Sequence, residues 1–338
     1  MTNPIIISIK SLKLTKIEKT NIHKYKPYGI ILFSRNISNF TQIKNLIKSI
    51  KFISKKTLIL IDQEGGIVNR FKKFSELNFL DNFEYYKIFL KYPSLGKQLV
   101  YLKSFITSYY LKLLGIDINT IPVLDLPNKN TIPMIKKRTF GPNINTNIIL
   151  NEIMINISNR FGIIPVMKHI PGHGITNKDS HLAMPISKAS KIELNKHMKL
   201  FKHFNYLPLA MTAHIKYINL DKNYIATFSP KIIKKIIRGN INFNGLIMSD
   251  DLIMKANTFD ISESISLSNN SGIDILLDCS SDWKRYLKII KNFNITSKFK
   301  NHKNFHLSIG NKPQFNLKSI NINHYHHLYN ELIKFYGI

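Results

Sequence analysis

Short apolar runs recur along the chain, and segments with apolar residues at helical spacing lie between them. Runs that are apolar at nearly every position are typical of strands buried on both faces of a sheet. Strands that alternate with helices about eight times predict a parallel sheet. The count predicts an α/β fold, a single-domain (β/α)8 TIM barrel. The predicted strands begin near Ile5, Gly29, Thr57, Ile116, Val166, Leu209, Gly245 and Ile273.

Single residues predict two details of these elements. The stretch 42–53 has apolar residues at helical spacing, and Thr41 before it is a suitable N-cap. Pro165 has no N–H to donate to a central ladder. We therefore expect the fifth strand to begin one residue later, at Val166.

The domain organisation follows from what separates the elements. No Gly-, Ser- or Pro-rich linker divides the chain, and no repeat of solenoid period occurs. We expect residues 1–338 to form one catalytic barrel domain. From about residue 297 the chain is rich in Asn, Lys and His, which predicts a loosely structured tail up to a last helix over 324–335.

The charge of the chain could suggest a nucleic-acid partner. Its 49 Lys and Arg against 20 Asp and Glu give a net charge of +29, and such a surface can bind polyanions by counterion release. The lysines, however, are scattered along the whole chain, and no RNA- or DNA-binding signature occurs. We expect the positive charge to reflect the overall amino-acid composition, and we expect no specific nucleic-acid partner.

The cysteine count and the length of the apolar runs indicate the cellular compartment of the protein. The single cysteine, Cys279, cannot form an internal disulfide, which fits a reducing compartment. No apolar stretch of about 18 residues occurs that could cross a membrane, and the run 5–7 is too short for a signal peptide. We therefore expect a cytoplasmic protein with no membrane partner. We also expect it to be a monomer.

Polar side chains follow four of the predicted strands. They are Asp62, the pair Lys168 and His169, His214, and Asp250. In a barrel the carboxyl ends of all strands meet at one rim, where active sites lie. Four polar strand ends that converge on one rim indicate a binding or catalytic site.

Strand alternation separates two neighbouring aspartates. Leu246, Met248 and Asp250 share one face of their strand. If the first two point into the barrel, Asp250 faces its mouth, and Asp251 points outward, where it could cap the following helix. The reverse orientation stays open from sequence alone.

The segment 168–181, KHIPGHGITNKDSH, carries three histidines. A zinc site is one reading, but the spacing His169-x3-His173-x7-His181 matches no common zinc motif. We expect neither a metal nor a cofactor. The pair Asp179 and His181 also suits proton transfer, since a carboxylate can orient an imidazole that titrates near neutral pH.

Taken together, these segments resemble the bacterial cytosolic β-N-acetylglucosaminidases of glycoside hydrolase family 3, the single-domain type used in peptidoglycan recycling. The matching segments, in order, are IDQEGGIVNRF (61–71), PVLD (122–125), KRTFG (137–141), KHIPGHG with DSH (168–174 and 179–181), MTAHIKY (211–217) and GLIMSDDL (245–252).

The resemblance implies a mechanism and a substrate. Asp250 would be the nucleophile of a retaining hydrolase, His181 the general acid/base and Asp179 its orienting partner. This Asp–His pair would replace the second carboxyl group that most retaining glycosidases use. The substrate would be a carbohydrate with a terminal β-linked N-acetylglucosamine, in particular N-acetylglucosamine linked β-1,4 to anhydro-N-acetylmuramic acid, with or without peptide. The residues implied to hold the sugar ring are Asp62, Arg70, Arg138, Lys168 and His169.

The chain departs from the family pattern at Ile67, where an arginine is usual, and a contact at the rim would be lost. We expect Glu64 to be structural, with its carboxylate bonded to backbone at the Gly65–Gly66 turn. His173 and His214 are expected to be structural or to support other site residues. Two other functions stay open: a glycoside phosphorylase on the same scaffold, and a degenerate barrel that binds nucleic acid through its charge. A β-glucosidase is disfavoured, because that type usually carries a second domain.

Overall fold

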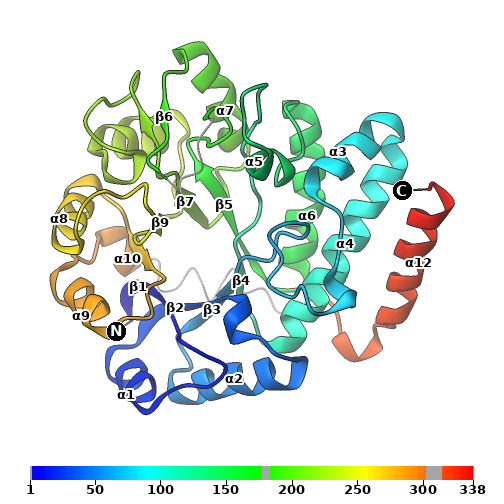
Figure 1. Cartoon of the computed structure of the whole chain (residues 1–338), viewed down its shortest axis with the longest axis horizontal. Helices are drawn as coiled ribbons and strands as arrows, with labels where there is room; N and C mark the ends of the chain where they lie inside the picture. Colours follow the sequence, from blue (N-terminus) through cyan, green and yellow to red (C-terminus); the bar gives the residue numbers. More distant parts are fainter. Residues whose placement is uncertain (1, 177–182, 302–313, 338) are drawn as a thin grey trace.

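A computed structural model describes residues 2–176, 183–301 and 314–337 of the chain. Within these residues, eight parallel strands close into a barrel in the order β1-β10-β9-β7-β5-β4-β3-β2 (Figure 1). The predicted (β/α)8 barrel is therefore confirmed. The strands are β1 (Asn3–Ser8), β2 (Pro27–Leu32), β3 (Leu58–Ile61), β4 (Ile118–Asn119), β5 (Ile164–Ile170), β7 (Leu209–Thr212), β9 (Leu246–Asp251) and β10 (Ile275–Asp278). A separate two-stranded sheet joins β6 (Ile186–Ser187) to β8 (Lys216–Tyr217).

Helices connect successive strands and surround the barrel (Figure 1). Two helices, α3 and α4, fill the connection between β3 and β4, and α5 and α6 fill the next one. The helices of the ring are α1 (Lys16–Tyr25), α2 (Phe40–Ile53), α3 (Asn82–Lys91), α4 (Pro93–Leu114), α5 (Pro133–Lys137), α6 (Ile144–Arg160), α7 (Lys191–His203), the π-helical segment η4 (Ile232–Asn240), α8 (Ile261–Ser271) and α9 (Trp283–Asn292). Single 3-10 turns are η1 (Ser34–Asn36), η2 (Ser75–Leu77), η3 (Ala226–Phe228) and η6 (Leu317–Ser319).

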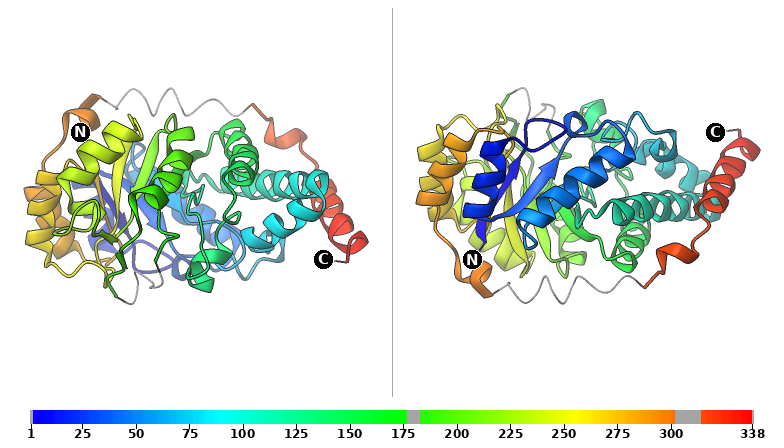
Figure 2. Two further views of the ribbon diagram at one scale, coloured as in Figure 1. Left: turned by 90° about the horizontal axis from the view of Figure 1, so that it is seen from above. Right: turned by 90° about the horizontal axis from the view of Figure 1, so that it is seen from below.

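The C-terminal segment ends in a helix, as the sequence predicts. After α10 (Ser297–Asn301), the helix α12 (Ile322–Phe335) begins two residues before the predicted start and packs along α4. It lies at the opposite end of the molecule from α1 and α9 (Figure 2). Among the described residues, no helix combines the length and the apolar character needed to cross a lipid bilayer.

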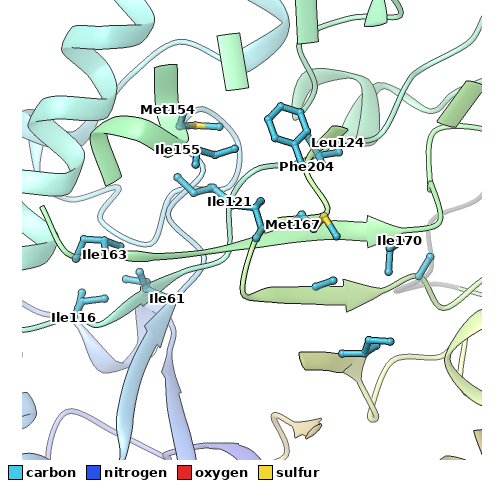
Figure 3. Packing of buried hydrophobic residues seen from close by; sticks show 14 of the residues in the cluster. Ile61, Ile116, Ile121, Leu124, Met154, Ile155, Ile163, Met167, Ile170 and Phe204 are labelled. Atoms are coloured by element: carbon cyan, nitrogen blue, oxygen red, sulfur yellow. The ribbon is translucent and has the colours of Figure 1, made fainter. Parts of the chain in front are cut away.

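The core has two parts, one inside the barrel and one between the sheet and the helices. Side chains that face outward from β5, such as Met167 and Ile170, belong to the same buried cluster as Met154 and Ile155 of α6 (Figure 3). Leu246 and Met248 lie in the barrel interior, which confirms the predicted orientation of their strand. The other interior side chains include Ile6, Ile31, Leu60, Ile118, Ile164, Val166, Leu209, Met211, Ile275 and Leu277.

Two predicted boundaries are wrong. Strand β5 begins at Ile164 and includes Pro165. The backbone N–H groups of Ile164 and Val166 donate to carbonyl oxygens next to β4, so the backbone nitrogen of Pro165, between them, is on the β7 side. The ladder with β7 begins only at Val166, where it pairs with Leu209, so no donor is missed. Helix α2 is capped by Asn39, whose side chain accepts from the backbone N–H of Gln42, and not by Thr41.

Candidate active site

A cavity of about 210 Å³ opens at the carboxyl ends of the barrel strands. Its polar wall is formed by Asp62, Glu64, Arg70, Arg138, Lys168, His169, His173, Asp250 and Asp251. Its apolar wall includes Ile31, Phe33, Ile67, Val68, Met134, Met211, Met254 and Leu277. The structure therefore brings together six of the eight predicted site residues. The other two, Asp179 and His181, lie outside the described residues.

The Asp62 carboxylate is held by two cations. Arg70 Nη2 lies 2.7 Å from Asp62 Oδ2, and Lys168 Nζ lies 3.3 Å from Oδ1. The Thr120 hydroxyl donates to the same Oδ1 and accepts from Lys168 Nζ at 2.8 Å. Burial alone would raise the pKa of this carboxyl, but Lys168, Arg70 and the Thr120 hydrogen bond together hold it well below its usual range. Asp62 is thus a fixed acceptor for a hydroxyl group.

Glu64 forms a second, deeper ion-pair cluster. Arg138 donates to both carboxylate oxygens, at 2.9 and 2.8 Å, and Lys168 Nζ lies 2.6 Å from Oε1. The prediction that this carboxylate bonds backbone at the glycine turn is wrong, because its partners are these two cations. Burial opposes ionisation, but Arg138 and Lys168 outweigh it and lower the pKa of Glu64 to about 2. Glu64 therefore carries no proton to donate at neutral pH.

His169 is oriented by a buried aspartate that the sequence analysis assigned no role. Asp125 Oδ2 lies 2.7 Å from His169 Nδ1, and its Oδ1 accepts from the backbone N–H groups of His169 and His173. Because a carboxylate only accepts, Nδ1 donates, and Nε2 faces Arg138 Nη2 at 3.4 Å. Burial would raise the pKa of Asp125, but these partners hold it well below its usual range. Asp125 ends the PVLD segment, so the rule of polar strand ends could have found it.

Asp250 lies at the end of β9, on the cavity wall, and its side chain is 9% exposed. The backbone N–H of Asp251 donates to Asp250 Oδ1 at 2.8 Å. This bond fixes one carboxylate oxygen, and the structure places the group where the cavity meets the barrel mouth. The predicted position of Asp250 at the mouth agrees with this placement.

The orientation predicted for Asp251 is wrong. The register of β9 against β10 shifts, since Ile275 pairs with Met248 but Leu277 pairs with Asp251. This bulge breaks the alternation, and Asp251 also lines the cavity. Its carboxylate accepts from the backbone N–H groups of Ile253 and Cys279, whereas α8 is capped by Asp260. Burial raises the pKa of Asp251 to about 6, even though these hydrogen bonds lower it.

The remaining residues singled out by sequence have different positions. His173 lines the cavity, and burial, together with the charge of His169, lowers its pKa to about 4. His214 is buried away from the cavity lining, with Nδ1 2.8 Å from the Thr227 hydroxyl. Ile67 lies on the cavity wall, and its backbone N–H donates to Asp81 Oδ1 at 2.8 Å.

The cavity suits a sugar ring. Fixed carboxylates and cations can accept from and donate to hydroxyl groups, and the apolar wall can cover a ring face. The family model described as Glycosyl hydrolase family 3 N terminal domain matches residues 6–304. The chain belongs to glycoside hydrolase family 3. As a member it is a glycosidase built on the barrel described above.

Similar proteins cover most of the chain. A beta-hexosaminidase of Actinobacillus pleuropneumoniae serotype 3 is 33% identical over 284 residues, which are 82% of this chain and 81% of that protein. A beta-hexosaminidase of Psychromonas ingrahamii is 29% identical over 296 residues, 82% of each chain. The crystal structure of NagZ from Neisseria gonorrhoeae in complex with N-trifluoroacetyl-D-glucosamine superposes with a TM-score of 0.84 at 27% identity and covers 98% of both chains.

Proposed function

We propose that this glycosidase is a retaining β-N-acetylhexosaminidase that releases terminal, non-reducing β-linked N-acetylglucosamine. The observation that carries the proposal is the cavity itself, which Asp250 lines together with the ion-paired carboxylates Asp62 and Glu64. The names of the relatives, and the N-acetylglucosamine derivative bound to the Neisseria protein, support the choice of sugar.

In the proposed mechanism Asp250 attacks the anomeric carbon and forms a glycosyl-enzyme intermediate. His181, oriented by Asp179, donates a proton to the departing oxygen and then takes one from the attacking water. Glu64 is a poor alternative for the acid, because Arg138 and Lys168 keep it ionised. The ring is held by Asp62, Arg70, Arg138, Lys168 and His169, which donate to or accept from its hydroxyl and acetamido groups.

The proposed natural substrate is N-acetylglucosamine linked β-1,4 to anhydro-N-acetylmuramic acid, with or without peptide. Its support is the resemblance of the sequence segments to the peptidoglycan-recycling members of the family. We further propose that the protein acts in the cytoplasm as a monomer, without a cofactor and as one catalytic domain over residues 1–338.

Trapping the intermediate tests the nucleophile. A fluorinated N-acetylglucosamine donor that slows the second step should leave the sugar attached to Asp250, as found by peptide mass spectrometry. Asp250→Asn should remove nearly all turnover with no change in thermal unfolding. A label on Asp62, Glu64 or Asp251 would overturn the assignment.

The role of the Asp179–His181 pair can be tested by changing the leaving group. A sugar alkoxide leaves poorly without a proton, and a positioned acid supplies typically about 10²–10⁴-fold. A nitrophenolate leaves without that help. His181→Ala should therefore reduce cleavage of a disaccharide far more than the first step on nitrophenyl N-acetylglucosaminide. Azide should partly restore turnover of the nitrophenyl substrate, with a β-glycosyl azide as product.

The matched variant is Asp179→Asn, which keeps the imidazole but removes its orienting charge and should give a weaker form of the same effect. Equal losses on activated and unactivated substrates would exclude this role.

Product analysis separates the proposed hydrolase from a phosphorylase and from a nucleic-acid-binding barrel. A hydrolase should yield free N-acetylglucosamine at a rate that millimolar phosphate leaves unchanged. Sugar 1-phosphate as the main product would show a phosphorylase. Salt-dependent binding to RNA or DNA without glycosidase activity would support the third function.

A further inference from the structure

Lys103 is a buried cation that lies outside the cavity lining. It lies on α4, it is 2% exposed, and its Nζ donates to Asn82 Oδ1 at 2.5 Å. Burial lowers the pKa of Lys103 to about 8, although the charges of Glu64 and Asp81 oppose the shift. The Tyr85 ring centroid lies 5.2 Å from Nζ. A lysine is seldom kept in such a place for packing alone, because burying its charge is costly.

Asn82 links this lysine to the backbone of a ring-binding residue. It is the first residue of α3, it is buried, and its Nδ2 donates to the carbonyl oxygen of Arg138 at 2.8 Å. The two ends of the amide have nearly the same shape, so its neighbours decide which end faces Arg138. An ammonium group only donates, and Lys103 therefore requires Oδ1 on its side. The NH2 group is then directed to the Arg138 carbonyl.

Lys103 also touches the turn that carries the partner of Arg138. A Cβ atom at Gly65 would lie 2.9 Å from Lys103 Cε, so the lysine side chain passes directly beneath this turn. Glu64 precedes the turn and receives the two-pronged bond from the Arg138 guanidinium. Lys103 is thus linked to both partners of the Arg138–Glu64 ion pair. It bonds Asn82, which bonds the Arg138 carbonyl, and it lies against Gly65, the residue after Glu64.

We propose that Lys103 and Asn82 are positioning residues that fix Arg138, and through it the bond to Glu64, in the ring-binding geometry. Arg138 needs such support because it follows the five-residue helix α5 in the long connection between β4 and α6. The kinetic test rests on the proposed function, since it uses nitrophenyl N-acetylglucosaminide as substrate.

The first experiment is a double-mutant cycle. Lys103→Met keeps the length of the side chain but loses the donor, and it should lower kcat/KM about tenfold, mostly through KM. In an Arg138→Ala background the same change should alter kcat/KM less than about twofold, because its target is already gone. Asn82→Asp gives Lys103 a charged partner but removes the donor to Arg138, so it should fold and show the same loss. Full additivity with Arg138→Ala, or no loss in either variant, would overturn the proposal.

The control is Lys51→Met. Lys51 lies on α2, pairs with Asp117 at 2.6 Å and does not line the cavity. It should change thermal stability without changing KM.

A second measurement does not depend on the substrate. The Nε–H resonance of Arg138, identified by its loss in Arg138→Ala, should shift in Lys103→Met and Asn82→Asp but not in Lys51→Met. If the wild-type protein did not cleave nitrophenyl N-acetylglucosaminide, the proposed function would be refuted, but this resonance measurement could still be made. An unmoved resonance in both variants would refute the positioning role.

Discussion

Replacing Glu64 by glutamine should destabilise the protein, because this carboxylate compensates two buried cations. The carboxylate is 1% exposed and is bonded by Arg138 through two N–H groups and by Lys168 through one. Glutamine has the same shape but no charge, and its NH2 group would face one of these donors. The two buried cations would lose the charge that compensates them.

The magnitude follows from the pKa of the carboxyl. The pKa falls from 4.5 to about 2 on folding, and one pKa unit corresponds to about 1.36 kcal/mol. The charged form therefore contributes about 3 kcal/mol to folding. Removing one partner of a buried ion pair usually costs about 3–5 kcal/mol, which agrees. Because the folded pKa is lowered, the contribution is complete above about pH 4.5 and is lost as the pH falls toward 2.

Urea unfolding at two pH values measures this effect. The free energy of unfolding of Glu64→Gln should lie about 3 kcal/mol below that of the wild type at pH 7, and about 1.4 kcal/mol below it at pH 3. The control is Glu84→Gln, which removes an exposed pair with Lys87 and should change stability by less than about 0.5 kcal/mol. A loss under about 1 kcal/mol at pH 7, or an equal loss at both pH values, would show that the Glu64 charge does not stabilise the fold in this way.

Three further changes test other parts of the site. Asp251 has a raised pKa of about 6, so its contribution to wild-type stability should fall by about 2 kcal/mol as the pH rises from about 4 to 6; Asp251→Asn should lack this fall in urea titrations, and an unchanged pH dependence would contradict it. Asp125→Asn weakens the charged hydrogen bond to His169 and should lower the free energy of unfolding by about 1.5–3 kcal/mol in thermal unfolding. An unchanged free energy of unfolding would show that this bond is weak. Gly66→Ala should destabilise by more than about 1 kcal/mol, because Gly66 has φ +58° and a Cβ would lie 2.7 Å from Asp81 Cα. Gly337→Ala, with φ +63° but open space around it, should cost less, and equal losses would mean that crowding at Asp81 is unimportant.

The strands, and the rim on which the site lies, are predictable from the sequence alone. The apolar runs are local, and burial on both faces requires them, so they predict strands without knowledge of the neighbours. Strand ends are equally local, which is why Asp62, Lys168, His169 and Asp250 could be placed at one rim before their contacts were known.

The pairing of side chains within the site depends on the tertiary structure. Glu64 and Arg138 are 74 positions apart, and His169 and Asp125 are 44 apart. No periodicity relates them, because closure of the barrel brings together the segments that follow different strands. The same holds for Asp251. Its side is set by a bulge against β10, which depends on how the neighbouring strand pairs and not on the sequence of β9 itself. Ion pairing and strand register arise between elements, so a pattern along one element cannot encode them.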